Sequence, residues 1–140
     1  MDSTATALIL LGVLLVAFVG VTYLVVGMKT GGRLATDKYQ AAWLTIQHSL
    51  EQHNAASWQL AVMNADKLLD QALRERHVRG KTMGERMKAA DKQWHNANQL
   101  WAAHKVRNQL AHETNATITY DTAVRSLAAF RQGLKDLGAI

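Results

Sequence analysis

The first 28 residues differ in kind from the rest of the chain. No charged residue occurs between Ser3 and Met28, and the 24 residues from Ala5 to Met28 are mainly Ala, Leu, Ile, Val, Phe and Gly. An α-helix rises about 1.5 Å per residue, so a run of this length spans the roughly 30 Å hydrocarbon core of a bilayer. No Lys or Arg precedes the run and no convincing cleavage site follows it, unlike in a signal peptide. The sequence therefore predicts a retained transmembrane anchor over residues 1–28.

Basic residues lie on only one side of this anchor. None precedes it, whereas Lys29, Arg33 and Lys38 follow closely. Because Lys and Arg concentrate in cytoplasmic loops, this asymmetry predicts an N-terminus outside the cell membrane and a cytoplasmic domain after the anchor. The chain has no cysteine, so no disulfide requires an oxidising compartment and no thiolate metal site exists. We expect a single-pass protein of the cell membrane, with the lipid bilayer as its first partner.

The sequence after the anchor favours helix throughout. Proline is absent, and Ala, Leu, Gln, Lys and Arg dominate. Gly31 and Gly32 interrupt a basic linker over residues 29–36, and residues 37–140 suffice for one domain with a modest core. Short loops between helices are typical of an antiparallel bundle. We therefore expect an all-α protein, in which the anchor is followed by a bundle of four or five helices.

Apolar periodicity and capping residues place the helices of this bundle. The expected helices cover about 36–53, 55–77, a short stretch opened by a capping box at Thr82, about 91–111, and a last stretch from Thr119 or Asp121. The last helix is expected to turn five apolar side chains inward, namely Val124, Leu127, Phe130, Leu134 and Leu137. The seven-residue spacing of Trp94 and Trp101 predicts two core residues on one face of the helix before it.

One short segment at the end of the third main helix carries a pattern with chemical meaning. Arg107 is followed by the polar Asn108 and, five residues after Arg107, by His112. The segment from Trp101 to Glu113 resembles the motif helix of the HEPN superfamily, which comprises small all-α domains with an Arg-polar-x-x-x-His motif. The resemblance covers about residues 37–138. It implies a HEPN-like bundle in which Arg107, Asn108 and His112 are the catalytic residues.

This resemblance also implies an activity. Known active members are mostly metal-independent endoribonucleases, and many work as dimers whose two motifs face each other. Other members are inactive relatives that serve as binding or scaffold modules. The resemblance therefore implies RNA as a partner, a homodimer, and no cofactor or metal. A Tyr two residues after the His marks one toxin subgroup, but Thr114 occupies that position here, so we do not place the chain in that subgroup.

The side chains of the motif suit such a reaction by themselves. RNA can be cut by attack of its own 2′-hydroxyl on the adjacent phosphate, and His is the side chain that moves protons near neutral pH. The planar guanidinium of Arg gives a bidentate positive fork against the phosphoryl oxygens, where negative charge builds up. We therefore assign proton transfer to His112 and the phosphate clamp to Arg107. Asn108 would hold the phosphate or orient His112.

The helical geometry of the motif favours a dimer. Five residues turn an α-helix by about 140°, so Arg107 and His112 do not share one face, whereas Asn108 and His112 do. One helix therefore leaves the cleft incomplete, and a second copy would complete it. Small residues recur along one face of the anchor, at Ala5, Gly12, Gly20 and Gly27. Such a stripe lets two transmembrane helices approach closely, although glycine is also common in such helices.

A structural role explains the same residues without catalysis. Arg107 would then pair with Asp66 or Asp70 on the preceding long helix, and His112 would stabilise the end of its own helix. Asp66 itself either orients Arg107, polarises His112, or is a plain surface residue. This alternative describes a non-catalytic, membrane-anchored binding or scaffold domain. A third possibility is a subunit of a larger membrane complex with an unidentified partner.

A basic cluster surrounds the short helix. Its cations exceed its carboxylates, Glu75 and Glu85, by four within fifteen residues. The cluster predicts a phosphate-binding surface, for RNA or for lipid headgroups, with a solvated loop as the alternative. Its members are Arg74, Arg76, Arg79, Lys81, Arg86 and Lys88.

Two other kinds of site are excluded by spacing. The six histidines form no pair with an Asp or Glu at metal-ligand spacing, so we expect no metal. The sequence Gly80-Lys81-Thr82 resembles the end of a phosphate-binding loop, but Glu75 stands where that loop requires Gly. No strand precedes it either, so a nucleoside triphosphatase is not expected.

Overall fold

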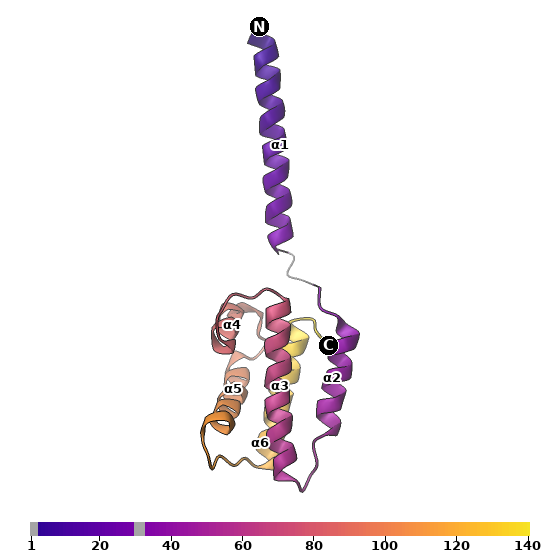
Figure 1. Ribbon diagram of the computed structural model, residues 1–140, viewed down its shortest axis with the longest axis vertical. Helices are drawn as coiled ribbons and strands as arrows, with labels where there is room; N and C mark the ends of the chain where they lie inside the picture. Colours follow the sequence, from indigo (N-terminus) through magenta and orange to yellow (C-terminus); the bar gives the residue numbers. More distant parts are fainter. Residues whose placement is uncertain (1–2, 30–32) are drawn as a thin grey trace. The chain divides into compact units, whose positions relative to one another are not determined.

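A computed structural model describes residues 3–29 and 33–140, and all regular secondary structure in them is helical (Figure 1). This confirms the all-α prediction. The chain divides into two compact units after Gly31, and the first of them is a single helix. The predicted break at Gly31 and Gly32 lies outside the described residues.

The first unit is α1 (Ser3–Lys29), one continuous helix over the predicted anchor. The most apolar 18-residue stretch within Ser3–Tyr23 has a mean hydropathy of 2.6, and none of that stretch is buried. By length and composition, α1 is the one described helix that is apolar enough to cross a membrane. The hydroxyl of Thr22 donates to the carbonyl oxygen of Phe18 (2.9 Å), so this polar group is satisfied within the helix.

The second unit is a helical bundle arranged around α3. Its elements are α2 (Thr36–His48), α3 (Ala55–Glu75), α4 (Met83–Ala89), the 3₁₀ turn η1 (Asp91–Gln93), α5 (Ala97–His112) and α6 (Tyr120–Asp136). α3 contacts α2, α4, α5 and α6, and α5 packs along α6. Successive long helices run in opposite directions, as the antiparallel prediction requires (Figure 1).

α3 is fixed by its cap and by its apolar stripe. The side chain of Asn54 accepts hydrogen bonds from the backbone N–H groups of Ala56 (3.1 Å) and Ser57 (3.3 Å), as predicted for an N-cap. The helix ends at Glu75, and His77 then adopts a positive φ of 56°, which turns the chain away. The fully buried apolar residues of the stripe are Ala61, Val62, Ala65, Leu69, Ala72 and Leu73.

The predicted helix over 91–111 is interrupted. η1 ends at Gln93, Trp94 is extended, and α5 starts afresh at Ala97 with Asn96 as its cap. The cause is the burial of Trp94, whose indole N–H donates to the carbonyl oxygen of Met87 (2.8 Å). This bond holds Trp94 against the end of α4, where a continuous helix could not place it. Trp94 is a core residue as predicted, but Trp101 is 36 % exposed, so the prediction for Trp101 was wrong.

α2 ends five residues earlier than predicted. The hydroxyl of Ser49 donates to the carbonyl oxygen of Ile46 (2.7 Å), which closes the last turn at His48. The next residues form a loop, because Trp58 of α3 donates its indole N–H to the carbonyl oxygen of Glu51 (2.6 Å). The Glu51 carbonyl, which would have no intrahelical partner even in a helix ending at His53, is thereby satisfied by α3.

α6 faces the core through a slightly different stripe from the predicted one. Leu127, Phe130, Leu134 and Leu137 are buried as expected, but Val124 is 40 % exposed. Small residues take its place, because Ala123 and Ser126 are buried. Gly133 is also buried, and a Cβ atom there would lie 3.3 Å from side-chain atoms of Leu69 and Leu100. α6 therefore approaches α3 and α5 more closely than a stripe of large residues would allow.

One ion pair joins the beginning of the bundle to the end of its central helix. The Nζ atom of Lys38, in the first turn of α2, lies 3.2 Å from Oε1 of Glu75, the last residue of α3. The chain therefore enters the bundle at the same end as the loop between α3 and α4 (Figure 1).

Candidate functional site

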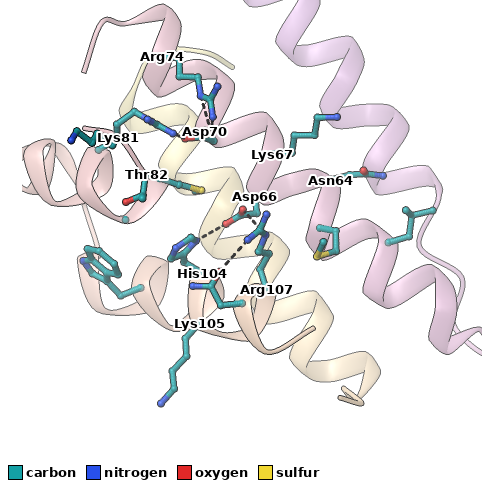
Figure 2. Close-up of a pocket in the computed structure, with 17 residues that line it drawn as sticks. Asn64, Asp66, Lys67, Asp70, Arg74, Lys81, Thr82, His104, Lys105 and Arg107 are labelled. Atoms are coloured by element: carbon teal, nitrogen blue, oxygen red, sulfur yellow. Dashed lines mark hydrogen bonds and ion pairs between the residues drawn. The ribbon is translucent and has the colours of Figure 1, made fainter. Parts of the chain in front are cut away.

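A groove of about 1010 Å³ lies between α3, the segment around α4, and α5. It is lined by residues between 60 and 74 of α3, 81–84 and 86 at α4, and residues between 101 and 108 of α5 (Figure 2). Three segments that are far apart in sequence therefore meet here, and each contributes polar or charged side chains.

The centre of the groove is built on Asp66, which is only 2 % exposed. Its Oδ1 atom lies 2.7 Å from Nδ1 of His104, and its Oδ2 atom lies 3.0 Å from Nε of Arg107 (Figure 2). A carboxylate only accepts hydrogen bonds, so we assign the hydrogen of the His104 ring to Nδ1, which donates. The other ring nitrogen, Nε2, is then the acceptor in the neutral form.

Helical spacing explains why one carboxylate holds both side chains. His104 and Arg107 are three residues apart on α5, so they lie on neighbouring turns of one face. Asp66 interrupts the apolar stripe of α3, where it faces α5 rather than solvent. Of the two partners that the sequence suggested for Arg107, Asp66 and Asp70, the structure pairs it with Asp66, which is not a plain surface residue.

Arg107 keeps donors that this pair does not use. Its Nη1 atom donates to Oδ1 of Asn108 (3.1 Å), and its side chain is 31 % exposed. A guanidinium has five N–H donors; Asn108 accepts from one of them, and Nε faces Asp66 at 3.0 Å as an ion pair without a hydrogen bond. The remaining N–H groups can meet an anion in the groove as a fixed fork.

A second carboxylate, Asp70, braces the α4 side of the groove. Arg86 donates to its Oδ1 atom through Nε (2.8 Å) and through Nη2, and donates through Nη1 to the carbonyl oxygen of Gly80 (2.8 Å). Arg74 reaches Oδ2 of the same carboxylate at 2.9 Å. Arg86 is only 4 % exposed, so it ties α4 to α3 and is not the free phosphate-binding cation that the sequence predicted.

The capping of α4 follows the predicted pattern with one difference. The Thr82 hydroxyl accepts from the backbone N–H of Glu85 (3.2 Å), as expected of the capping box. The Glu85 carboxylate, however, accepts from the backbone N–H of Lys81 (2.6 Å), one residue before the cap. This bond fixes the backbone of Lys81 at the rim of the groove.

The groove has a positive charge. Six basic side chains and two carboxylates line it, a formal net charge of +4 with neutral His. Within the described part of the chain, the cations of the lining that have no ion pair are Lys67, Lys81 and Lys105. Lys105 extends away from Asp66 (Figure 2). Arg76, Arg79 and Lys88 of the predicted basic cluster do not line the groove.

His112 lies apart from this arrangement. It is the last residue of α5, its side chain is exposed, and it does not line the groove. Arg107 and Asn108 do line it, so the fold brings two of the three predicted motif residues together. The residue that sequence reasoning missed is His104. Its signal was the three-residue spacing from Arg107, opposite an aspartate set within an apolar stripe.

An aromatic ring stands beside the central cluster. Trp101 lines the groove and meets the His104 ring edge to face, with a centroid distance of 6.1 Å and an interplanar angle of 75°. Its ring also borders Gly84 of α4, where a Cβ atom would lie 3.7 Å away. The groove therefore offers an apolar surface next to its charged centre.

Among the described residues, no group of three His, Asp or Glu side chains is arranged to hold a metal ion. Comparisons of the chain with protein-family models, with curated proteins and with solved structures find no match. The site is therefore described by its own geometry, as a groove with a positively charged lining in an all-α domain.

Proposed function

We propose that the protein is a membrane-anchored, HEPN-like domain that binds RNA in this groove and cleaves it without a metal. The observation that carries the proposal is the Arg107 guanidinium, held by a buried carboxylate at the centre of a groove with net positive charge. The surrounding cations attract a polyanion, and the unused N–H groups of Arg107 can donate hydrogen bonds to one of its phosphates. Asn108, which accepts from Arg107, helps to fix the plane of that fork.

The proposal includes where the domain works. α1 would cross the cell membrane with its N-terminus outside, which places the groove in the cytoplasm, where RNA is present. Two copies joined through the small-residue face of α1 would form the homodimer that the motif favours.

The experiment uses the full-length chain in nanodiscs of uncharged lipid, with EDTA present. Binding and cleavage of fluorescent RNA oligonucleotides of several sequences are measured, with DNA of the same sequences alongside. We expect RNA to be bound and cut, and DNA to be bound but not cut, because it lacks the 2′-hydroxyl. Arg107→Ala should lower the cleavage rate by about 10²–10³-fold. Arg131→Ala, which removes an exposed arginine outside the groove, is the matched control and should change little.

A binding or scaffold domain is the second candidate. It is favoured by the Asp66–Arg107 pair, which joins α3 to α5, and by the position of His112 outside the groove. This function predicts that Arg107→Ala lowers the melting temperature while no RNA is cut by any variant. A folded wild-type protein that leaves every RNA intact would establish this second candidate over the nuclease.

A further inference from the structure

We infer that His104, and not His112, is the group that moves the proton during RNA cleavage. The inference rests on the proposed function and names its missing catalytic residue. His104 lies outside the Arg-polar-x-x-x-His pattern, so only its place in the fold points to it. It is 8 % exposed and lines the groove, whereas His112 is exposed elsewhere.

The ring of His104 has two side-chain contacts, with Asp66 and Trp101, and the backbone of Gly84 lies on its α4 side. Asp66 accepts from Nδ1 at 2.7 Å, and Trp101 meets the ring edge to face. On the α4 side, a Cβ atom at Gly84 would lie 3.9 Å from Nε2. Because Nδ1 is committed to Asp66, Nε2 is the nitrogen left to take a proton. A histidine whose second nitrogen is held by a carboxylate has the arrangement of a general base.

The same carboxylate places the base beside the phosphate clamp. Its two oxygens bind His104 and Arg107, so the imidazole and the guanidinium are neighbours across a single carboxyl group. A phosphate bound by the free N–H groups of Arg107 would therefore lie next to the ring of His104. No second copy of the chain is needed to bring these two groups together.

These residues and water together balance the reaction. Nε2 of His104 takes the proton of the 2′-hydroxyl, the 2′-oxygen bonds to phosphorus, and the bond from phosphorus to the 5′-oxygen breaks. The leaving 5′-oxygen takes a proton from water, and the His104 imidazolium later returns its proton to solvent. The products are a 2′,3′-cyclic phosphate and a 5′-hydroxyl end. Arg107 stabilises the negative charge on the phosphoryl oxygens.

The decisive variant is His104→Asn, tested in the full-length chain in nanodiscs. The Asn side-chain amide can donate to Asp66 in place of Nδ1–H, but it has no nitrogen that takes up a proton near neutral pH. We expect His104→Asn to fold and to bind RNA like the wild type, with cleavage reduced by at least about 10²-fold. His104→Ala should regain part of its cleavage when imidazole is added, because the cavity opens into the groove. His112→Ala should cut RNA within about threefold of the wild-type rate.

The outcomes separate this inference from the proposed function. If His104→Asn cuts RNA normally, then His104 is structural and the inference is wrong. If cleavage is lost in His112→Ala and kept in His104→Asn, the proposed nuclease stands and its base is His112. If the wild type binds RNA but cuts none, both the nuclease and its base are rejected.

Discussion

Nε of Arg107 lies 3.0 Å from Oδ2 of Asp66, so a partly exposed cation is held by a carboxylate that is almost fully buried. The other oxygen of that carboxylate binds His104. Asp66 is thus the shared support for both groups that the proposed chemistry needs. Its removal is expected to affect the fold as well as the groove.

Asp66→Ala should lower the free energy of unfolding by about 3 kcal/mol, because it leaves Arg107 and His104 without their buried partner. Urea unfolding of the detergent-solubilised chain measures this, with fluorescence of the four tryptophans, which all lie in the bundle. Asp121→Ala breaks an ion pair whose two side chains are more than 70 % exposed, and should cost under about 1 kcal/mol. Equal costs for the two variants would contradict the supporting role of Asp66.

The loop at Gly80 passes so close to α4 that position 80 requires a glycine. Its φ is 148°, and a Cβ atom there would lie 2.6 Å from the backbone nitrogen of Arg86. We expect Gly80→Ala to cost about 1–3 kcal/mol of stability, measured by the same unfolding experiment. Gly84→Ala is the matched control, because its Cβ would make only ordinary contacts at 3.7 Å or more. Gly84→Ala should be neutral or slightly stabilising within its helix.

Trp101 should stack on a base of the bound RNA. Alanine substitution at a stacking position typically costs about 1–3 kcal/mol per base, so Trp101→Ala should weaken binding of single-stranded RNA by roughly 5–100-fold. Trp101→Phe should retain most of the affinity. Tyr120→Ala is the control, since Tyr120 is exposed to the same degree, 37 %, but does not line the groove. Equal affinity of Trp101→Ala and wild type in a fluorescence anisotropy titration would rule out stacking.

Acid should weaken the end of α3 through Glu75. The hydrogen bond from the Gln71 amide, with a smaller contribution from Lys38, lowers the pKa of Glu75 below its ordinary value of 4.5. The resulting stability is complete above pH 4.5 and is lost as the pH falls through the lowered pKa of the folded state. Gln71→Ala should therefore lose less stability than the wild type between pH 6 and pH 3. Gln109→Ala, on an exposed position of α5, should follow the wild type across this range.

The orientation of the chain can be tested because it contains no cysteine. A single cysteine is placed either near the N-terminus, as Ser3→Cys, or near the end of α6, as Lys135→Cys. In intact cells, a membrane-impermeant maleimide should label the first variant only, and should label the second after lysis. The reverse pattern would place the groove outside the cell and argue against RNA as its ligand.

The sequence predicted what depends on local spacing. The α3 stripe, the Asn54 and Thr82 caps, and most of the inward face of α6 follow from periodicity and capping chemistry. The break before α5 could not be predicted in this way. The break exists because the Trp94 indole donates a hydrogen bond to the carbonyl oxygen of Met87. The residues next to Trp94 in the sequence do not indicate that contact.

The residues of the candidate site also divide into those that local spacing predicts and those that only the folded structure brings together. Arg107, Asn108 and Asp66 were identified from a motif and from helical facing, and all three line one groove. His104 was missed because its meaning depends on a carboxylate 38 residues away in sequence. Arg86 was assigned to a phosphate-binding surface because residues 74–88 carry an excess of basic side chains, whereas Asp70 on another helix pairs with it and holds it in a buried position.

The Lys38–Glu75 pair has a mechanical consequence. Tension on the N-terminal segment would reach the bundle at the buried Leu34 and the first turn of α2, where this exposed pair joins α2 to the end of α3. An exposed ion pair is a weak restraint, so this pair would give way more readily than the buried side chains of α2, which are Tyr39, Trp43 and Ile46. The groove between α3, α4 and α5 includes no residue of α2, so its walls would stay intact while the tether is strained.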